Sequence, residues 1–377
     1  MSATPWTSAD GRVSLHVGDS RDVLRGIADA SVDAVVCDPP YELGFMGRKW
    51  DASGIAYDVD LWRQVARAMK PGAHLLAFGG TRTYHRMTCA IEDAGFEIRD
   101  CIAWIYGSGF PKSLDVSKAI DKAAGAERKV VGSYTVGGTA AKGKHKGRAT
   151  CAADEGSAKG ATLDLAITAP ATDDARRWAG WGTALKPAHE PIVVARKPIE
   201  GTVANNVATY GTGAINVDGC RVAYTTETEL GDVRVVGRWP ANVALDEEAA
   251  QGMGEPSRYF YTAKASTFER EQGLAHRTKR KVSDGREATA DNPRLRGESL
   301  RGNTHPTVKP IDLMRWLCRL VAPPNGLILD PFAGSGSTLI AAHAEGFRAV
   351  GIELDEEHAS IARDRLGAHA PLFVGLR

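Results

Sequence analysis

The chain has 377 residues, 43% of them hydrophobic and 25% charged, with a formal net charge of +1 at pH 7. This length allows one full core or about two domains, and the balanced charge gives no whole-chain sign of a nucleic-acid binder. No apolar run approaches the ~20 residues of a membrane span and the amino terminus lacks signal-peptide features, so we expect a soluble, cytoplasmic protein. The six cysteines lack zinc-ligand spacing, so we expect reduced thiols and no metal site.

Short apolar runs alternate with helical patterns along much of the chain. The runs predict strands over residues 13–17, 32–37, 73–78, 98–106, 191–195, 327–329 and 349–352. The spacing of Trp62, Val65 and Met69 predicts a helix that stops at 70–72, and further helices are predicted over 312–320, 338–345 and 356–366. Strand and helix in alternation are typical of an α/β fold, with a doubly wound, mainly parallel sheet and helices on both faces.

Two stretches interrupt this alternation. Residues 121–185 are rich in Gly, Ala, Thr and Lys, and residues 199–304 have weak periodicity. Each contains a basic cluster, made of Lys142, Lys144, Lys146 and Arg148 in the first and of Lys279, Arg280 and Lys281 in the second. We interpret both stretches as insertions or a smaller lobe attached to the sheet.

The tetrapeptide Asp38-Pro39-Pro40-Tyr41 follows the apolar run that ends at Cys37. It is therefore expected to leave the carboxyl end of a buried strand, where open α/β sheets bind ligands. The Asp38 carboxylate and the Pro39 carbonyl can accept the two hydrogens of an exocyclic amine, and Tyr41 offers a face on which a base can stack. The same residues would also suit an ordinary turn at the end of a strand.

A second loop, 330–337, follows the run 327–329 and contains Gly334 and Gly336. Such glycines let backbone N–H groups approach a ligand closely. Position 339, where a dinucleotide fingerprint has its third glycine, is Leu339, and the acidic Glu353 lies 17 positions after Gly336. A carboxylate there can accept ribose hydroxyls, a contact common to NAD and S-adenosylmethionine sites, so the loop by itself suits either cofactor.

Four segments together resemble the motifs of the DNA amino-methyltransferases, in the beta group whose catalytic motif precedes the cofactor motif. They are Asp-Pro-Pro-Tyr at 38–41, His-Pro-Thr-Val-Lys-Pro at 305–310, Asp-Pro-Phe-Ala-Gly-Ser-Gly-Ser-Thr at 330–338 and Gly-Ile-Glu at 351–353. The resemblance covers about residues 11–110 and 186–366, and the middle segments are similar to phage-type and actinobacterial members. It implies a Rossmann-like, S-adenosylmethionine-dependent methyltransferase fold with a circularly permuted motif order.

The resemblance also implies roles for single residues. Asp38, Pro39, Pro40 and Tyr41 would hold the target base. The cofactor site would comprise Asp19, Ser20, His305, Thr307, Lys309, Asp330, Phe332, Gly334, Ser335, Gly336, Ser337 and Glu353. In this site the 330–337 loop would surround the methionine part of S-adenosylmethionine, and Glu353 would contact its ribose. Asp19 and Ser20 would contact the adenine of the cofactor, and Thr307 and Lys309 would lie near its methionine carboxylate.

Simpler interpretations exist for three of these residues. His305 would equally serve to shape its proline-flanked turn. Lys309 would be a solvated loop charge, as lysines commonly are. Asp19 would cap a helix that begins near Arg21, which is compatible with adenine binding.

The resemblance divides the chain by function. Residues 11–120 with 186–198 would form the catalytic half of the methyltransferase domain, 121–185 a basic insertion, 199–304 the target-recognition region and 305–377 the cofactor half. Duplex DNA is the expected partner, and the two basic clusters are the expected phosphate contacts. A homodimer is a family expectation, and a cognate restriction endonuclease cannot be deduced.

An aspartate at the first motif position favours adenine N6 over cytosine N4, because cytosine-specific relatives more often have serine there. The expected activity is therefore site-specific methylation of adenine in DNA after base flipping, with N4-cytosine methylation as the alternative. More distant alternatives are an RNA or protein-glutamine methyltransferase, a nicotinamide oxidoreductase and a non-catalytic DNA-binding protein. The sequence does not indicate the recognition sequence.

Overall fold

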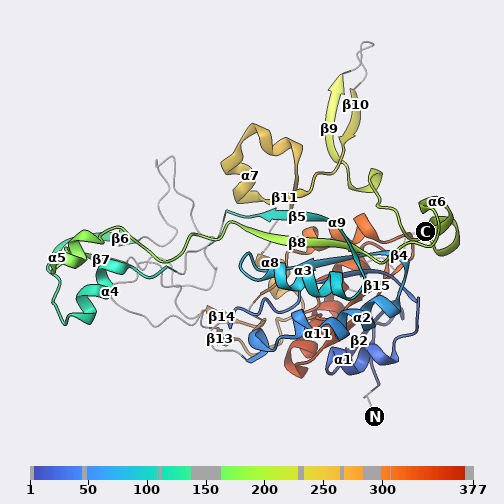
Figure 1. Cartoon of the computed structure of the whole chain (residues 1–377), viewed down its shortest axis with the longest axis horizontal. Helices are drawn as coiled ribbons and strands as arrows, with labels where there is room; N and C mark the ends of the chain where they lie inside the picture. The colour runs from blue at the N-terminus through green and yellow to red at the C-terminus, as the bar shows by residue number, and fades with distance from the viewer. Residues whose placement is uncertain are drawn as a thin grey trace. The chain divides into compact units, whose positions relative to one another are not determined.

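A computed structural model describes residues 4–44, 49–107, 109, 113–136, 163–227, 233–263, 267–282, 299–305 and 307–369 of the chain. The chain forms two compact units (Figure 1). The first comprises Met1–Gly107, His189–Thr278 and Gly302–Arg377, and the second comprises Ser108–Ala188 and Lys279–Arg301.

The first unit is built on a ten-stranded sheet. In spatial order its strands are β1 (Trp6–Thr7), β2 (Val13–Val17), β16 (Arg348–Glu353), β15 (Leu327–Asp330), β3 (Val32–Cys37), β4 (Met69–Phe78), β8 (His189–Arg196), β5 (Glu97–Ile105), β11 (Val243–Asp246) and β12 (Tyr261–Ala263). The strands β2, β16, β15, β3 and β4 are parallel neighbours, while β8 runs antiparallel to both β4 and β5. The expected α/β fold with a mainly parallel sheet is therefore confirmed.

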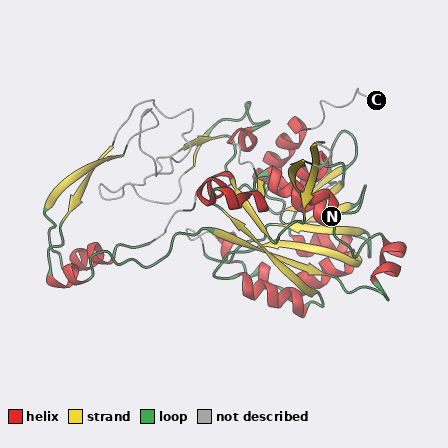
Figure 2. Cartoon of the chain, turned by 90° about the horizontal axis from the view of Figure 1, so that it is seen from above, coloured by secondary structure: helices red, strands yellow, loops and turns green. Residues whose placement is uncertain are grey.

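Helices cover both faces of this sheet, as Figure 2 shows. They are α1 (Ser20–Val23), α2 (Val59–Ala68), α3 (Tyr84–Asp93), α9 (Ile311–Val321), α10 (Ser337–Ala344) and α11 (Glu356–His369). Alternate strand residues serve different cores: Val35 and Cys37 of β3 pack with α2 and α3, whereas Ala34 and Val36 pack with α9 and α10. By this alternation, Asp38 belongs to the α9 and α10 face.

The predicted elements agree with the structure except at one junction. The helix that was expected to continue through Met69 ends at Ala68, and Met69 begins β4 by pairing with Val32. The pairing then shifts register before it resumes between Ala34 and His74. Pro71 and Gly72, which looked like a helix stop, lie within this irregular start of the strand, where Pro71 has no N–H to donate and Gly72 has φ +76°.

Strand order brings the two predicted loops together. Leu329 of β15 pairs with Val35 of β3, so the loops after these strands leave neighbouring positions at one edge of the sheet. β15 also pairs with β16, and β16 with β2. The loops 38–41 and 330–337 therefore lie side by side at the level of the strands.

The remaining helices and strands are divided between the two units. In the first unit they are α6 (Val203–Tyr210), β9 (Val222–Glu227), β10 (Val233–Arg238), α7 (Glu247–Met253) and α8 (Thr267–Glu271). In the second they are α4 (Val116–Ala123), β6 (Val130–Val136), β7 (Leu163–Thr168), α5 (Asp173–Arg177), β13 (Arg280–Val282) and β14 (Ser299–Arg301). Much of the stretch 199–304 thus joins the main unit, and its role in target recognition stays a prediction. In the described part of the chain, every helix is too short or too polar to span a bilayer.

Trp62 joins the α2 core to the 330–337 loop and provides a test of this packing. Its side chain is fully buried, its Nε1 donates to the Ala56 carbonyl at 3.0 Å, and its ring packs edge-on against Phe332 with centroids 6.2 Å apart. We expect Trp62→Ala to lower the free energy of unfolding by about 3–5 kcal/mol, measured by urea unfolding followed by circular dichroism. Trp239, which is 66% exposed, is the matched control, and a similar loss in Trp239→Ala would contradict the assignment of Trp62 to the core.

Candidate functional site

Acidic residues lie at the carboxyl ends of four neighbouring strands. Asp19 follows β2, Glu353 ends β16, Asp330 ends β15 and Asp38 follows β3. Parallel strands place these ends at one edge of the sheet, so the edge concentrates negative charge. Such an edge favours a cationic ligand or one rich in hydrogen-bond donors.

Asp38 is held from one side only. Its Oδ2 accepts a hydrogen bond from Lys309 Nζ at 2.7 Å, in an ion pair that links two segments far apart in the chain. Its Oδ1 is buried and has no hydrogen-bond partner among the described residues. Burial raises the pKa of Asp38, and Glu190 adds to the rise while Lys309 opposes it. The side chain therefore presents one free acceptor atom, and a buried acceptor without a donor is unfavourable unless a ligand supplies one.

Tyr41 is fixed at both its side chain and its backbone. Its hydroxyl donates to Glu190 Oε2 at 2.8 Å and accepts from Lys309 Nζ at 3.1 Å. Its carbonyl accepts from Thr83 Oγ1 at 2.7 Å. Burial raises the pKa of Tyr41 well above its usual value, so the phenol stays protonated. The predicted stacking of a base on this ring stays a prediction.

Lys309 lies just before α9 and is 7% exposed at its side chain. Besides Asp38, its Nζ lies 3.3 Å from Glu190 Oε2 and 4.8 Å from the centre of the Phe78 ring. The simpler interpretation of Lys309 as a solvated loop charge is therefore wrong, because two carboxylates and two aromatic rings surround the ammonium. The ammonium contacts the 38–41 loop directly.

His305 and Thr307 form the turn that leads to Lys309. His305 Nδ1 lies 2.7 Å from the Thr307 carbonyl, and the ring packs edge-on against His358 with centroids 4.6 Å apart. Burial lowers the pKa of His305 to about 3, so the imidazole is neutral and Nδ1 donates its proton to that carbonyl. His305 thus shapes its turn, while a direct contact between His305 and a ligand stays a prediction.

The glycine loop needs its glycines for close packing. Gly334 has φ +51°, and a Cβ there would lie 2.7 Å from His305 Nε2. Gly336 has φ +81° and precedes α10, where a Cβ would lie 3.0 Å from the Cβ of Ala362. Phe332 packs on Trp62, as described above. The backbone of the loop therefore runs closer to its neighbours than any other residue type allows.

Asp330 begins this loop from a buried position, with 1% exposure. Its Oδ1 accepts from the Phe332 N–H at 2.9 Å. Burial raises the pKa of Asp330 to about 7, hydrogen bonds from Thr338 and Phe332 oppose the rise, and repulsion by Asp38 and Glu353 adds to it. Near neutral pH this carboxyl is therefore poised between its neutral and charged forms.

A fully buried arginine supports the loop from behind. Arg365 of α11 donates to the Ser335 carbonyl at 2.5 Å and to Ser335 Oγ at 2.9 Å, and its Nη1 lies 3.4 Å from Ser337 Oγ. Ser335 and Ser337 are buried as well, so their hydroxyls serve the loop itself. Burial lowers the pKa of Arg365 to about 10, which leaves it charged at neutral pH.

Glu353 and Asp19 have partners that leave room for a ligand. Glu353 accepts from the Gly334 N–H at 2.7 Å and from the Asp355 N–H at 2.9 Å, one on each oxygen. Each oxygen has a second lone pair for a hydroxyl donor. Asp19 caps α1 through the Arg21 N–H at 2.9 Å and pairs with the Arg21 guanidinium, as the simpler interpretation of this residue predicted.

Ser20 ties the segment after β2 to the cofactor loop, because its Oγ donates to the Pro331 carbonyl at 2.5 Å. The side chain is buried. The Ser20 hydroxyl therefore donates its proton within the protein. The contact of Ser20 with the adenine of the cofactor stays a prediction.

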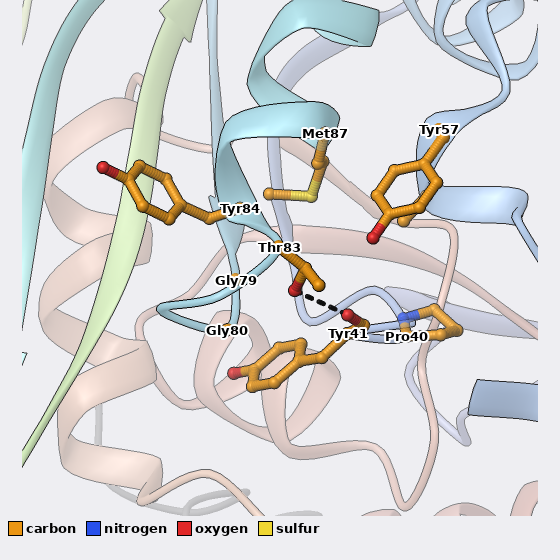
Figure 3. Close-up of a pocket in the computed structure, with 9 residues that line it drawn as sticks. Pro40, Tyr41, Tyr57, Gly79, Gly80, Thr83, Tyr84 and Met87 are labelled. Atoms are coloured by element: carbon orange, nitrogen blue, oxygen red, sulfur yellow. Dashed lines mark hydrogen bonds between the residues drawn. The ribbon is translucent and has the colours of Figure 1, made fainter. Parts of the chain in front are cut away.

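A narrow pocket opens beside the catalytic loop, between that loop, the 3-10 helix Ile55–Tyr57 and α3 (Figure 3). Figure 3 shows the Thr83 hydroxyl bonded to the Tyr41 backbone at its floor. The pocket is lined by Pro40, Tyr41, Ala56, Tyr57, Gly79, Gly80, Thr83, Tyr84 and Met87. Its walls are mostly aromatic and apolar.

The two basic clusters lie apart from these residues in the chain. Lys142, Lys144, Lys146 and Arg148 lie outside the described residues. Lys279 is exposed, Arg280 begins β13 in the second unit, and Lys281 is the next residue of that strand. Their role as phosphate contacts stays a prediction.

Two residues of the site were not anticipated from the sequence. Glu190 was placed just before a predicted strand and was given no role. Arg365 lies in the helix that was predicted over 356–366 and was also given no role. Its apolar neighbours Ile361, Ala362 and Leu366 were the only available signal, because they place position 365 on the buried side of α11.

Residues 32–364 match the family model N6_N4_Mtase, described as DNA methylase. The type II methyltransferase M.HindIII of Haemophilus influenzae is 25% identical over 304 residues, which cover 80% of this chain and 65% of that protein. YubD of Escherichia coli is 39% identical over 111 residues, which cover 29% of this chain and 47% of YubD. The chain thus spans about half to two thirds of these relatives.

Among solved structures, the PvuII DNA methyltransferase, titled as cytosine-N4-specific, superposes with a TM-score of 0.47 at 13% identity. The superposition covers 95% of this chain and 86% of that one.

The buried Arg365 predicts a defect in ligand binding. Arg365→Met keeps a long side chain but removes the donors to Ser335, so the loop loses its fixed geometry. We expect the affinity for S-adenosylmethionine, the ligand that the motifs indicate, to fall about 10-fold, measured by titration calorimetry. Arg363→Met on the same helix, where Arg363 pairs with Glu356, should bind like the wild type. Equal affinities in all three proteins would remove Arg365 from the support of the loop.

Proposed function

Because this chain belongs to the DNA methylase family of N6 and N4 amino-methyltransferases, we propose that it transfers a methyl group to the N6 amine of adenine in duplex DNA. S-adenosylmethionine is the cofactor of this family. The observation that carries the proposal is the free acceptor Oδ1 of Asp38, buried at the edge of the sheet next to the glycine loop. Cytosine N4 is the alternative, since it presents an amine of the same kind.

The residues at this edge of the sheet suit S-adenosylmethionine. Asp330, Glu353 and Asp19 lie along three adjacent strand ends and suit a ligand that has positive charge and hydroxyl donors. Gly334 and Gly336 leave the loop backbone without side chains. When bound, S-adenosylmethionine supplies an electrophilic methyl group on a sulfonium sulfur.

The residues of the catalytic loop would activate the amine. The nitrogen lone pair of an exocyclic amine is delocalised into the ring, which makes it a poor nucleophile. Asp38 Oδ1 and the Pro39 carbonyl would each accept one amine hydrogen, so that the lone pair localises and points toward the methyl group. Lys309 supports this role because it occupies the other carboxylate oxygen at 2.7 Å and so fixes which oxygen is free.

Duplex DNA enters the proposal through the geometry of its bases. A paired adenine must rotate out of the helix to reach a buried carboxylate, which costs a few kcal/mol that contacts with the phosphates must offset. We assign such contacts to the basic clusters 142–148 and 279–281. The aspartate at position 38 supports adenine as the target, because the resemblance implies that cytosine-specific members more often have serine there.

The first test is methyl transfer itself. Asp38→Ala removes the acceptor, so we expect the transfer of radiolabelled methyl to duplex DNA to fall at least 10³-fold while cofactor affinity changes less than about 3-fold. Methylation-aware sequencing of DNA from cells that express the wild-type protein should reveal N6-methyladenine at one recognition sequence. N4-methylcytosine would select the alternative base, and transfer that persists in Asp38→Ala would refute the role of Asp38.

A second test uses the titration of Asp330. Its pKa of about 7 leaves it about half protonated at pH 7, and a cation bound beside it favours the charged form. Binding of the cofactor should therefore release about half a proton from Asp330 at pH 7, and the affinity should rise with pH between about 6 and 8. Calorimetry in buffers of different ionisation heat measures this release. Asp330→Asn keeps the titration of the ligand's own amine, so an equal release in that variant would exclude Asp330 as the source.

A further inference from the structure

A second, partly buried carboxylate lies beside Asp38, Tyr41 and Lys309. Glu190, near the start of β8, has a side chain that is only 20% exposed. Its Oε2 accepts from the Tyr41 hydroxyl at 2.8 Å and lies 3.3 Å from Lys309 Nζ. Neither the family motifs in the sequence nor the amine-holding role of Asp38 uses this residue.

The cluster contains one more negative charge than positive charge. Asp38 and Glu190 share a single ammonium, that of Lys309, at 2.7 and 3.3 Å. Burial of Lys309 works to lower its pKa, but the two carboxylates outweigh that effect and raise it. Since the pKa of Tyr41 is also raised, both donors keep their protons, and only the carboxylates can accept another.

Few other titratable groups face this pair. Asp330 at the end of β15 repels Asp38, and the Cys37 thiol precedes Asp38 on the other face of β3. Tyr106 after β5 has a pKa raised to about 12, chiefly by burial and then by Glu190. Phe78 and Trp104 complete the surroundings with apolar rings 6.3 Å apart. Lys309 is therefore the one cation among the described neighbours of the two carboxylates named here.

Methylation of an amine releases a proton that the site must take up. As the nitrogen–carbon bond forms, the carbon–sulfur bond breaks and its electron pair stays on sulfur, so the positive charge arrives on the amine nitrogen. That nitrogen then loses one proton. Asp38 Oδ1, which already accepts an N–H of the amine in the proposed function, is the nearest base.

A carboxylate paired alone with a buried ammonium is a weak base, because the cation stabilises its charged form. A second carboxylate on the same ammonium weakens that effect and restores basicity to the first. Resting on the proposed function, we propose that Glu190 is a positioning residue that shares the Lys309 ammonium with Asp38, and thereby keeps Asp38 able to take the proton released by the methylated amine. Glu190 also holds the Tyr41 hydroxyl in the same arrangement.

The test is Glu190→Gln, which keeps an oxygen acceptor for Tyr41 but removes the charge. Activity requires ionised Asp38, so the single-turnover rate falls on the acidic side as Asp38 becomes protonated. Loss of the neighbouring negative charge lowers the pKa of Asp38. The acidic limb of the pH–rate profile should therefore move to lower pH by about one unit. The plateau rate should fall about 10-fold because the base is weaker, with DNA and cofactor affinities within about 2-fold. A lower plateau with no shift of the limb would overturn the proposal.

Glu190→Asp and Glu97→Gln complete the series. Glu190→Asp keeps the charge and should leave the acidic limb near its wild-type position. Glu97, which pairs with Arg196 at the opposite end of the same two strands, is the matched control, and Glu97→Gln should behave as the wild type. A limb that moves equally in Glu97→Gln would show that the shift is nonspecific and overturn the assignment.

A second measurement does not depend on turnover. Carbon-13 NMR of the aspartate carboxyls, with Asp38 assigned from its loss in Asp38→Asn, should show that Asp38 titrates at lower pH in Glu190→Gln than in the wild type. If the wild-type protein transferred no methyl to DNA, the proposed function would fail, and this titration would still decide the role of Glu190. An unchanged titration of Asp38 in Glu190→Gln would refute the proposed role of Glu190.

Discussion

The ammonium of Lys309, buried between two carboxylates, is the interaction on which the catalytic side of the site depends. It joins the loop after β3, the start of β8 and the turn before α9, which lie far apart in the chain. None of the three charges would be stable alone at this depth, because removing an ion from water costs several kcal/mol unless partners compensate. The mutual burial of these groups therefore fixes the relative positions of the three segments, and it fixes which oxygen of Asp38 remains free.

The residues around the 330–337 loop have a different electrostatic arrangement. Asp38 and Glu353 both repel Asp330 across the edge of the sheet, and the raised pKa of Asp330 reflects burial together with that repulsion. Behind the loop, the cationic Arg365 holds Ser335 by its carbonyl and hydroxyl. The loop is thus attached to a positive charge on its protein side while its ligand side stays negative. A cation bound at the rim would relieve the repulsion.

Much of the fold could be predicted from local patterns, since buried parallel strands read as apolar runs. The exception at Met69 arose because helix and strand follow each other directly there, and an apolar residue suits both. The motif residues at positions 38, 330 and 353 could also be located, because each directly follows or ends such a run. The residues that contact them in space could not be predicted, because no local pattern indicates the order of the strands in the sheet.

Glu190 illustrates the limit most clearly. In a wholly parallel sheet, a residue at the start of a strand lies on the rim opposite the ligand. β8 runs antiparallel to its neighbours, so its first residues lie beside the carboxyl ends of β4 and β5. The direction of a strand depends on its long-range pairing, and a run of apolar residues gives no indication of it. The burial of Lys309 could not be predicted for a similar reason, since it depends on Phe78, Asp38 and Glu190 from three distant segments.

The strand order has one more consequence, for the synthesis of the protein. β2 and β3 are made early, yet β16 and β15 lie between them and are made some three hundred residues later. While the ribosome is still translating, β2 and β3 therefore have open hydrogen-bonding edges that only the last part of the chain can fill. Such non-local pairing slows folding and leaves the nascent chain exposed to wrong partners. The strand order that places the loops after β3 and β15 side by side thus makes closure of the sheet wait for the last part of the chain.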